Sequence, residues 1–317
     1  MKQFVGVDIG GTDIKFGIFT ETGNILEKWQ VPTDIGSQGE NLWSQITTEI
    51  CVHTDNGRSV SGIGVGVPGP VQKDGFVEVC VNLGIRNFNP REILGRVFPD
   101  KTIAVGNDAN VAALGEMWQG SGQGYENLVV ITLGTGVGGG VIMDGKIVYG
   151  AKGLSGEIGH MMVNPDETEL CTCGGRGCLD QMASATGIVR YTKKLLAQKY
   201  APTVLDEKEA LTAKKVFDAA RAGDKLAAHS VEHCLSFLGK SLAFVSYVID
   251  PEIFIIGGGV SHAGDYLIKI VQEYYDQYSL LKKEKARIVL ATLGNDAGIY
   301  GAARMAQKEK KGKNEKV

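Results

Sequence analysis

The sequence predicts an α/β fold made of two similar halves. Glycine is abundant, with 44 residues among 317, and it gathers at the ends of short apolar runs that are typical of strands. Two stretches, 4–32 and 127–150, share one layout in which a strand, a glycine turn, a second strand, a tight turn and a third strand follow one another. Each stretch leads to helical segments and two further strands, which indicates a duplicated α/β architecture.

The strands of each half follow from apolar runs that are bounded by turn residues. In the first half we expect strands within 5–9, 14–19, 25–31, 61–69 and 101–108. In the second half we expect them within 128–133, 137–143, 147–149, 251–259 and 286–296.

The second half carries more helix, mainly within 186–249. Apolar residues three and four apart predict one buried stripe, formed by Val231, Leu235, Leu238, Leu242, Val245 and Ile249. We expect a smaller N-terminal domain, 1–118, on which a last helix at about 297–310 packs back, and a larger C-terminal domain, 119–296. Two α/β domains usually enclose a cleft, and ligands favour such clefts.

Composition excludes several classes of protein. The net charge of -3 argues against nucleic acid as a partner, because proteins that bind the phosphate backbone carry a basic excess. No apolar run approaches the ~20 residues needed to span a bilayer, so we expect no membrane partner. The N-terminus leads directly into a strand without the apolar region of a signal peptide. We therefore expect a cytoplasmic protein whose six cysteines are thiols or metal ligands.

Glycine-rich turns occupy the same place in each half, "DIGGT" at 8–12 and "LGTGVGG" at 133–139. Glycine lets the backbone approach a ligand closely, and successive N–H groups in such a turn can hold an anion. Phosphate binding is thus our interpretation, and a pair of plain hairpin turns is the alternative.

Three other sequence motifs match known binding patterns, but the secondary structure expected around them does not suit those functions. Residues 134–139 match G-x-G-x-x-G, but a strand follows where a dinucleotide site requires a helix. Gly239-Lys240-Ser241 resembles the end of a P-loop, yet it lies inside a helix and Cys234 replaces the first glycine. The zinc-protease pattern H-x-x-E-H at 229–233 puts both histidines opposite the apolar stripe, so we expect a solvated face there.

A cluster of one histidine and three cysteines predicts a zinc site. His160, Cys171, Cys173 and Cys178 provide four ligands, and the glycines between the cysteines suit a loop folded around a metal. Because protein would fill all four positions, the metal is expected to be structural. Unligated thiols are the alternative.

The tetrapeptide GNDA appears twice, at 106–109 and 294–297, and each copy stands between a strand and a helix. Asp108 suits either a catalytic base or a plain helix N-cap, since Asp is favoured at both. Asp296 opens a helix rich in Gly and Ala, so we expect an N-cap there and close packing of that helix.

The ordered motifs resemble the ROK group of sugar kinases and related repressors. They are DxGGT at Asp8, GND ending at Asp108, LGTGxGGG at Leu133, ExGH at Glu157, CxCGxxGC at Cys171 and GGG at Gly257. The resemblance covers nearly the whole chain, and the ordered set is specific although each motif alone is weak. The stretches "NDANVAALGEMW", "ITLGTGVGGG" and "ASATGIVR" look closest to bacterial glucokinases of the Gram-positive type. The implied fold is the duplicated actin-like, ribonuclease H-like ATPase fold, with two α/β domains around a cleft.

This resemblance also implies an activity and a set of site residues. A glucokinase would transfer the γ-phosphoryl group of ATP to the 6-hydroxyl of glucose, with Asp108 as general base. The residues expected to bind sugar are Asn107, Asp108, Glu157, His160 and Asp180. The residues expected near the nucleotide and its phosphates are Asp8, Gly10, Gly11, Thr12, Gly134, Thr135, Gly136, Gly257, Gly258 and Gly259. Asp8 would lie near Mg²⁺, and the family tendency implies a homodimer.

One position departs from the family pattern, and several alternatives remain. The family usually has Glu where this chain has Asp180, and the shorter carboxylate would reach a sugar hydroxyl directly or through water.

The main alternative to glucose as the substrate is another hexose, namely fructose, mannose, N-acetylglucosamine or N-acetylmannosamine. A sugar-responsive repressor would carry a helix-turn-helix ahead of the first strand, where only three residues stand here. An actin-like structural or chaperone ATPase is the remaining alternative, and polyphosphate is an alternative donor to ATP.

Overall fold

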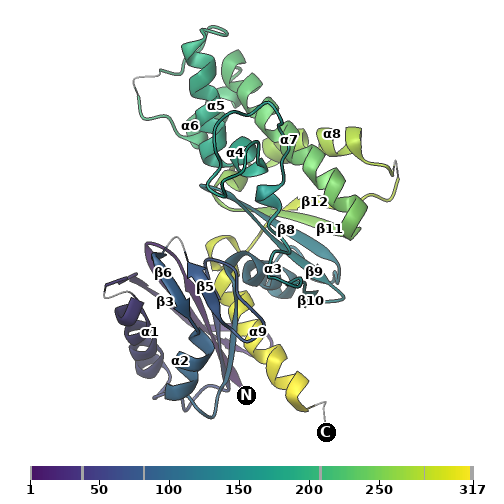
Figure 1. Cartoon of the computed structure of the whole chain (residues 1–317). Helices are drawn as coiled ribbons and strands as arrows, with labels where there is room; N and C mark the ends of the chain where they lie inside the picture. Colours follow the sequence, from purple (N-terminus) through teal and green to yellow (C-terminus); the bar gives the residue numbers. More distant parts are fainter. Residues whose placement is uncertain (1, 37–38, 81–82, 207–208, 282, 315–317) are drawn as a thin grey trace. The chain divides into compact units, whose positions relative to one another are not determined.

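The chain forms two compact units. The computed structural model describes residues 2–36, 39–80, 83–206, 209–281 and 283–314, and Figure 1 labels most of its helices and strands. Unit 1 comprises Met1–Gly124, Gly140–Ser155 and Leu293–Val317, and unit 2 comprises Tyr125–Gly139 and Gly156–Thr292. The segment Gly140–Ser155, which we expected in the C-terminal domain, is counted with unit 1. A Cβ on Gly140 would lie 2.6 Å from the carbonyl oxygen of Ala109, so the two backbones are in direct contact.

Two five-stranded sheets have the same strand order. The first has the order β3-β2-β1-β4-β7 and the second β10-β9-β8-β11-β12. The first sheet consists of β1 (Gln3–Ile9), β2 (Asp13–Thr20), β3 (Ile25–Pro32), β4 (Gly62–Val67) and β7 (Thr102–Asn107). The second consists of β8 (Leu128–Leu133), β9 (Val137–Met143), β10 (Lys146–Ile147), β11 (Ile253–Gly257) and β12 (Arg287–Leu290). This shared order confirms the duplicated α/β plan, in which an antiparallel meander is followed by parallel strands.

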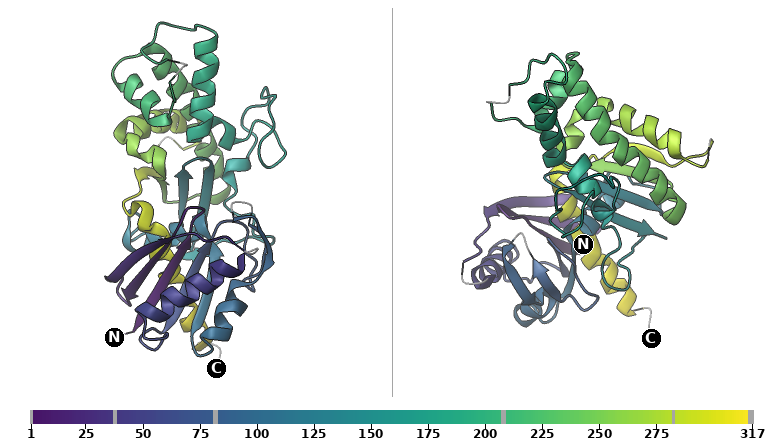
Figure 2. Two further views of the ribbon diagram at one scale, coloured as in Figure 1. Left: turned by 90° about the vertical axis from the view of Figure 1, so that its left-hand side faces the viewer. Right: turned by 45° about the horizontal axis from the view of Figure 1, so that its top comes forward.

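Side chains alternate between the two faces of the first sheet. Val5, Val7 and Ile9 of β1 join a core with residues of α1 (Glu40–His53) and α2 (Pro90–Val97). The opposite face of β1 packs against α9 (Ala297–Asn314), which also contacts α3 (Asp108–Gln119). Figure 2 shows α1 and α2 on one side of this sheet. Unit 1 also contains a two-stranded sheet of β5 (Val77–Cys80) and β6 (Ile85–Phe88).

Glycines bring α9 against the sheet backbone. A Cβ on Gly6 of β1 would lie 1.9 Å from the carbonyl oxygen of Ile299, and one on Gly64 of β4 would lie 1.8 Å from that of Ala302. Likewise, a Cβ on Gly301 would lie 1.7 Å from the carbonyl oxygen of Val111 in α3. The close packing expected of this helix is therefore confirmed, because only glycine leaves room for such contacts.

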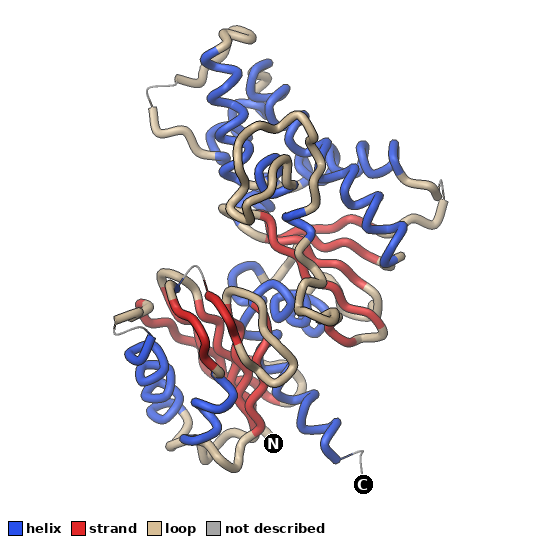
Figure 3. Tube along the Cα trace, in the orientation of Figure 1, coloured by secondary structure: helices blue, strands red, loops and turns tan. Residues whose placement is uncertain are grey.

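Unit 2 places helices against β8, β11 and β12. Its helical elements are η3 (Ile158–His160), α4 (Leu179–Ala183), α5 (Ala185–Ala197), α6 (Ala213–Arg221), α7 (Lys225–Ile249), η4 (Gly259–Ala263) and α8 (Asp265–Tyr278). The stripe expected on α7 is buried from Val231 to Val245. Figure 3 shows the long loop between η3 and α4 in tan. None of the helices within the described ranges has the length and hydrophobicity of a membrane-spanning segment.

Two details of the second half differ from the expectation. The third strand is β10, which ends at Ile147 and does not reach Tyr149. His229 and His233 do not form a solvated face, since both are half-buried. The ring of His233 stacks on Tyr191 at 4.1 Å between centroids, and His229 stacks on Tyr200 at 4.5 Å. The helical wheel missed these contacts because the partners come from α5 and the segment after it.

Candidate functional site

The first glycine turn joins β1 to β2 and is braced from one side. The Gly10 amide donates to the carbonyl of Asp13 at 3.0 Å. Thr33, which follows β3, donates from its hydroxyl to the Gly10 carbonyl at 2.8 Å and from its amide to the Thr12 carbonyl at 2.8 Å. Gly11 and Thr12 remain exposed. A turn that is fixed on one side and open on the other suits an anion.

Asp8 lies near the end of β1, on the face covered by α9. A Cβ on Gly298 of α9 would lie 2.4 Å from its carboxylate, and one on Gly66 of β4 would lie 3.5 Å from it. Burial, together with the negative charge of Asp108, raises the pKa of Asp8 to about 6, against a lowering effect of Lys15. Gly298 therefore provides the space that Asp8 occupies, a requirement that the sequence motif did not reveal.

The first GND motif divides two roles between adjacent residues. Asn107 is the N-cap of α3, because its side-chain oxygen accepts a hydrogen bond from the Asn110 amide at 3.1 Å. The alternative of Asp108 as the N-cap is therefore wrong. Asp108 is the first residue of the helix, and its carboxylate accepts hydrogen bonds from Asn107 Nδ2 at 3.0 Å and the Ala109 amide at 2.8 Å. Asn107 also donates to the Gly69 carbonyl at 3.1 Å, so it orients the carboxylate beside it.

In unit 1, the carboxylates of Asp8 and Asp108 interact electrostatically. Asp8 lies near the end of β1 and Asp108 directly follows β7, and both strands are parallel to the β4 strand between them. The negative charge of Asp108 is one cause of the raised pKa of Asp8. Because oxygen ligands suit Mg²⁺, a bound divalent cation would favour the charged form of Asp8.

The second glycine turn, between β8 and β9, is braced by α4 and α5. The Gly134 amide donates to the Gly136 carbonyl at 2.9 Å, and the Ala185 amide donates to the Gly134 carbonyl at 2.9 Å. The Val137 amide donates to the Asp180 carboxylate at 2.6 Å. Thr135 is exposed. The structure thus brings Asp180 to the turn expected to hold phosphates.

The Gly257–Gly259 segment joins the end of β11 to the start of η4. Gly258 has a φ of 82°, and a Cβ there would lie 2.5 Å from the carbonyl oxygen of Leu133. The backbone is exposed at Gly258 and Gly259, and nothing lies within 4 Å of a Cβ on Gly259. The positive φ and the close contact both require glycine at 258, and the exposed backbone next to the Gly134 turn can receive a ligand.

The four expected zinc ligands lie together in unit 2. The ligand atoms of His160, Cys171, Cys173 and Cys178 all lie within 4.8 Å of one another. His160 directs Nδ1 toward the Cys171 sulfur at 3.8 Å, while its Nε2 lies 4.0 Å from a carboxylate oxygen of Glu157. This arrangement leaves one imidazole nitrogen for a metal and the other for a carboxylate, as metal-binding histidines commonly require.

The donor set fits zinc in chemistry as well as in spacing. Burial raises the pKa of the Cys178 thiol to about 12, and the sulfur of Cys173 lies 3.6 Å from that of Cys178. A metal ion offers the positive charge that holds such thiols as thiolates. One imidazole and three sulfurs are a usual tetrahedral zinc set.

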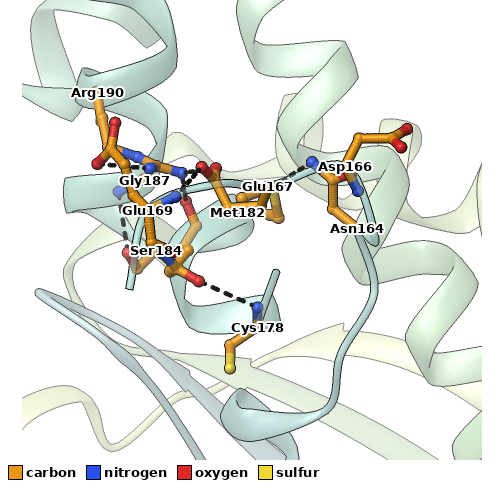
Figure 4. Close-up of polar contacts among 10 residues, drawn as sticks. Asn164, Asp166, Glu167, Glu169, Cys178, Met182, Ser184, Gly187 and Arg190 are labelled. Carbon is orange, nitrogen blue, oxygen red and sulfur yellow. Dashed lines mark hydrogen bonds and ion pairs between the residues drawn. The ribbon is translucent and has the colours of Figure 1, made fainter. Parts of the chain in front are cut away.

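An ion-paired arginine anchors the loop between His160 and Cys171. Arg190 of α5 pairs with Glu167 at 2.5 Å and with Glu169 at 2.9 Å, and Figure 4 shows these contacts. Gln181 continues the connection, since it donates to the Glu169 carbonyl at 3.1 Å and accepts from the Cys178 amide at 3.3 Å. The sequence motifs missed Arg190 because its partners lie about twenty residues away without a fixed pattern.

The second GND motif has a different environment. Gly294–Asp296 forms the short 3-10 helix η5 before α9. The Asp296 carboxylate accepts a hydrogen bond from Lys28 of β3 at 2.7 Å, and the Asn295 carbonyl accepts one from Lys15 at 3.1 Å. The side chain that we expected as an N-cap is therefore engaged in an ion pair instead.

Two sheets of equal strand order, each with a glycine turn after its first strand, define a duplicated actin-like α/β fold. A model of the ROK family matches residues 4–309, and the chain belongs to this family. A glucokinase of Halalkalibacterium halodurans is 41% identical over 317 residues, which cover 97% of this chain and 96% of the relative.

Solved structures of the same family have similar folds. A ROK family glucokinase from Streptomyces griseus, determined in complex with glucose and AMPPNP, has a TM-score of 0.78 and 33% identity, over 96% of this chain and 99% of that one. A ROK hexokinase from Thermus thermophilus has a TM-score of 0.84 and 31% identity, over 98% of this chain and 99% of that one.

Proposed function

We propose that this protein is an ATP-dependent glucokinase, which converts glucose and ATP to glucose 6-phosphate and ADP. The observation that carries the proposal is the placement of Asp108 at the first position of α3, where Asn107 takes over the capping role and holds the carboxylate. The 41% identity to a glucokinase, over nearly the full length of both chains, supports the choice of substrate. Phosphoryl transfer depends mainly on positioning and charge stabilisation, which glycine turns and carboxylates can provide.

In the proposed reaction, Asp108 accepts the proton of the sugar 6-hydroxyl as that oxygen attacks the γ-phosphorus. The bond between the γ-phosphorus and the bridging oxygen breaks, and ADP leaves with that oxygen. A base of this kind contributes roughly 10²–10⁴-fold to the rate. Within unit 1, phosphate groups would bind the turn that carries Gly10, Gly11 and Thr12.

The second turn would bind through Gly134, Thr135 and Gly136. Gly257, Gly258 and Gly259 would lie at the adenosine, because the backbone is exposed at Gly258 and Gly259 and nothing lies within 4 Å of a Cβ on Gly259.

Several of the expected polar side chains would bind sugar hydroxyls. Asn107 retains its carbonyl oxygen as an acceptor with a second lone pair beyond the one used for capping. Glu157 and His160 are exposed and adjacent, so they can bind neighbouring hydroxyls. Asp180 was expected to join them, and its carboxylate also accepts a hydrogen bond from the Val137 amide of the second glycine turn.

Two metal ions are part of the proposal. Mg²⁺ at Asp8 would neutralise charge on the phosphates when bound. Zn²⁺ would be held by His160, Cys171, Cys173 and Cys178, with a structural role, because four protein ligands leave no open position. The zinc would fix the loop that carries Glu157 and the start of α4.

We also propose a homodimer. Apolar side chains are exposed near the ends of α7 and α8, namely Phe244, Tyr247, Val248, Leu280 and Leu281. An exposed apolar group of this kind is typical of a protein contact. Sedimentation equilibrium should give a mass near twice that of the chain, and a monomer at micromolar concentration would contradict the proposal.

A panel of sugars and donors tests the function. Glucose, fructose, mannose, N-acetylglucosamine and N-acetylmannosamine are each compared for kcat/KM with ATP and Mg²⁺, and glucose is also paired with polyphosphate. We expect the highest kcat/KM for glucose with ATP. A higher value for another hexose would reassign the substrate, and no turnover of any sugar would remove the kinase proposal.

A further inference from the structure

The structure assigns to Asp180 a positioning role on the nucleotide side: its carboxylate holds the Gly134–Val137 turn in the form that receives phosphate. This inference rests on the proposed function, and it moves the main effect of Asp180 from the sugar to the nucleotide. It is carried by contacts within unit 2 alone.

The first observation is a short hydrogen bond. The Val137 amide donates to Asp180 Oδ1 at 2.6 Å. A bond to an ionised acceptor is stronger than one between neutral groups. It fixes the peptide plane between Gly136 and Val137, at the edge of the turn, so the turn has less conformational freedom to lose when it binds an anion.

The second observation concerns Gly136. A Cβ there would lie 2.5 Å from Asp180 Oδ1, and its three nearest heavy atoms would all belong to Asp180. Gly136 is not among the glycines with a positive φ. The carboxylate, rather than the backbone conformation, therefore requires glycine at this position.

The third observation is the anchoring of Asp180 itself. It stands in the first turn of α4, directly after Cys178 and Leu179. The Leu179 amide donates to the Met161 carbonyl at 2.9 Å, and the Cys178 amide is bonded to Gln181. The loop that carries the cysteine cluster thus fixes the position of the Asp180 carboxylate. The carboxylate in turn fixes the conformation of the Gly134–Val137 turn.

The main test separates the two substrates. Replacing Asp180→Ala removes the acceptor, and we expect the KM for ATP to rise about tenfold, the size expected for one charge-assisted hydrogen bond. The KM for glucose should change less than the KM for ATP. Asp180→Asn keeps an acceptor oxygen of the same size and should restore most of the ATP affinity. Asp166→Ala removes an exposed carboxylate from the same region and serves as the matched control.

A double-mutant cycle tests the contact directly. Gly136→Ala in the wild-type background should raise the KM for ATP, because the new methyl group displaces the carboxylate. In the Asp180→Ala background the same change has no side chain to displace, so its additional effect should be small. Equal effects of Gly136→Ala in both backgrounds would contradict the inference.

Hydrogen exchange tests the hydrogen bond between Val137 and Asp180 without requiring catalytic turnover. The Val137 amide should exchange faster in Asp180→Ala than in the wild type and the control, and calorimetry with AMPPNP should show weaker binding. If wild-type protein phosphorylates no sugar, the proposed function falls while these two measurements still decide the role of Asp180. Unchanged Val137 exchange, or a loss of glucose affinity alone, would overturn the inference.

Discussion

The two GND motifs have the same three residues and opposite electrostatic surroundings. In the first, Asn107 caps α3 and Asp108 shares its neighbourhood with a second carboxylate, Asp8. In the second, Lys28 pairs with Asp296 and Lys15 binds the adjacent carbonyl. A paired carboxylate is held in place by its cation, whereas a carboxylate beside another acid favours protons and metal ions. The two copies therefore differ in the residues that surround them and not in their own sequence.

The largest expected effect separates the two aspartates by activity. Asp108→Asn should lower kcat by about 10²–10⁴-fold, because the base is lost while the size of the side chain is kept. Asp296→Asn is the matched control and should leave kcat within a small factor of wild type. Initial rates at saturating glucose and ATP measure both. Equal losses of kcat in the two variants would contradict the assignment of Asp108 and of Asp296.

The acidic neighbourhood of the first copy should appear in the pH dependence of stability. The folded-state pKa of Asp8 is about 6, above its ordinary value of 3.8. The folded state then binds the proton more tightly than the unfolded chain, so the Asp8 contribution to stability falls as pH rises from about 4 to 6. The Asp8→Asn variant has no carboxyl to titrate, so it does not lose this contribution of about 2–3 kcal/mol. The free energy of unfolding of Asp8→Asn minus that of the wild type should therefore increase as pH rises across that range.

Urea unfolding at pH 4 and pH 7 measures that change. A carbon NMR titration of the Asp8 carboxyl provides the internal check: its pKa should fall toward the ordinary value in Asp108→Asn, since one raising charge is gone. A carboxyl that titrates near 3.8 in the wild type would show that burial does not act on Asp8 as inferred.

Within the part of the chain that the structure describes, the cluster of one histidine and three cysteines occurs in the second half of the duplication and has no counterpart in the first. Cys173 is the exposed cysteine of the cluster, so Cys173→Ser removes a ligand with little change in packing. Metal binding should stabilise the wild type by about 2.7 kcal/mol at a metal concentration 100 times Kd. This stabilisation should be lost or reduced in Cys173→Ser. Thermal unfolding with and without zinc measures the effect, and Cys51→Ser, outside the cluster, is the control. A wild-type Tm that does not respond to zinc or to a chelator would remove the metal from the proposal.

Much of the fold could be predicted from local patterns, and the partners of the site residues could not. Alternating apolar residues and glycine turns gave the strands of both halves, because a sheet imposes a period of two. The same signal cannot distinguish Asn107 from Asp108 as the cap, since both are favoured cap residues one position apart. Asp296 and Lys28 are 268 residues apart, and Asp180 and Val137 are 43 apart. No sequence period connects such pairs.

The smallest effect tests the second copy by itself. Lys28 and Asp296 are partly exposed, with side-chain exposures of 50% and 31%, so solvent screens their pair. Asp296→Ala should lower the free energy of unfolding by less than about 1 kcal/mol, and the difference should shrink in high salt. Lys28→Ala should give a loss of similar size, and the double variant should cost less than the sum of the two. A loss of several kcal/mol that persists in high salt would mean that Asp296 stabilises the start of α9 through the backbone, as the cap that its place in the sequence first indicated.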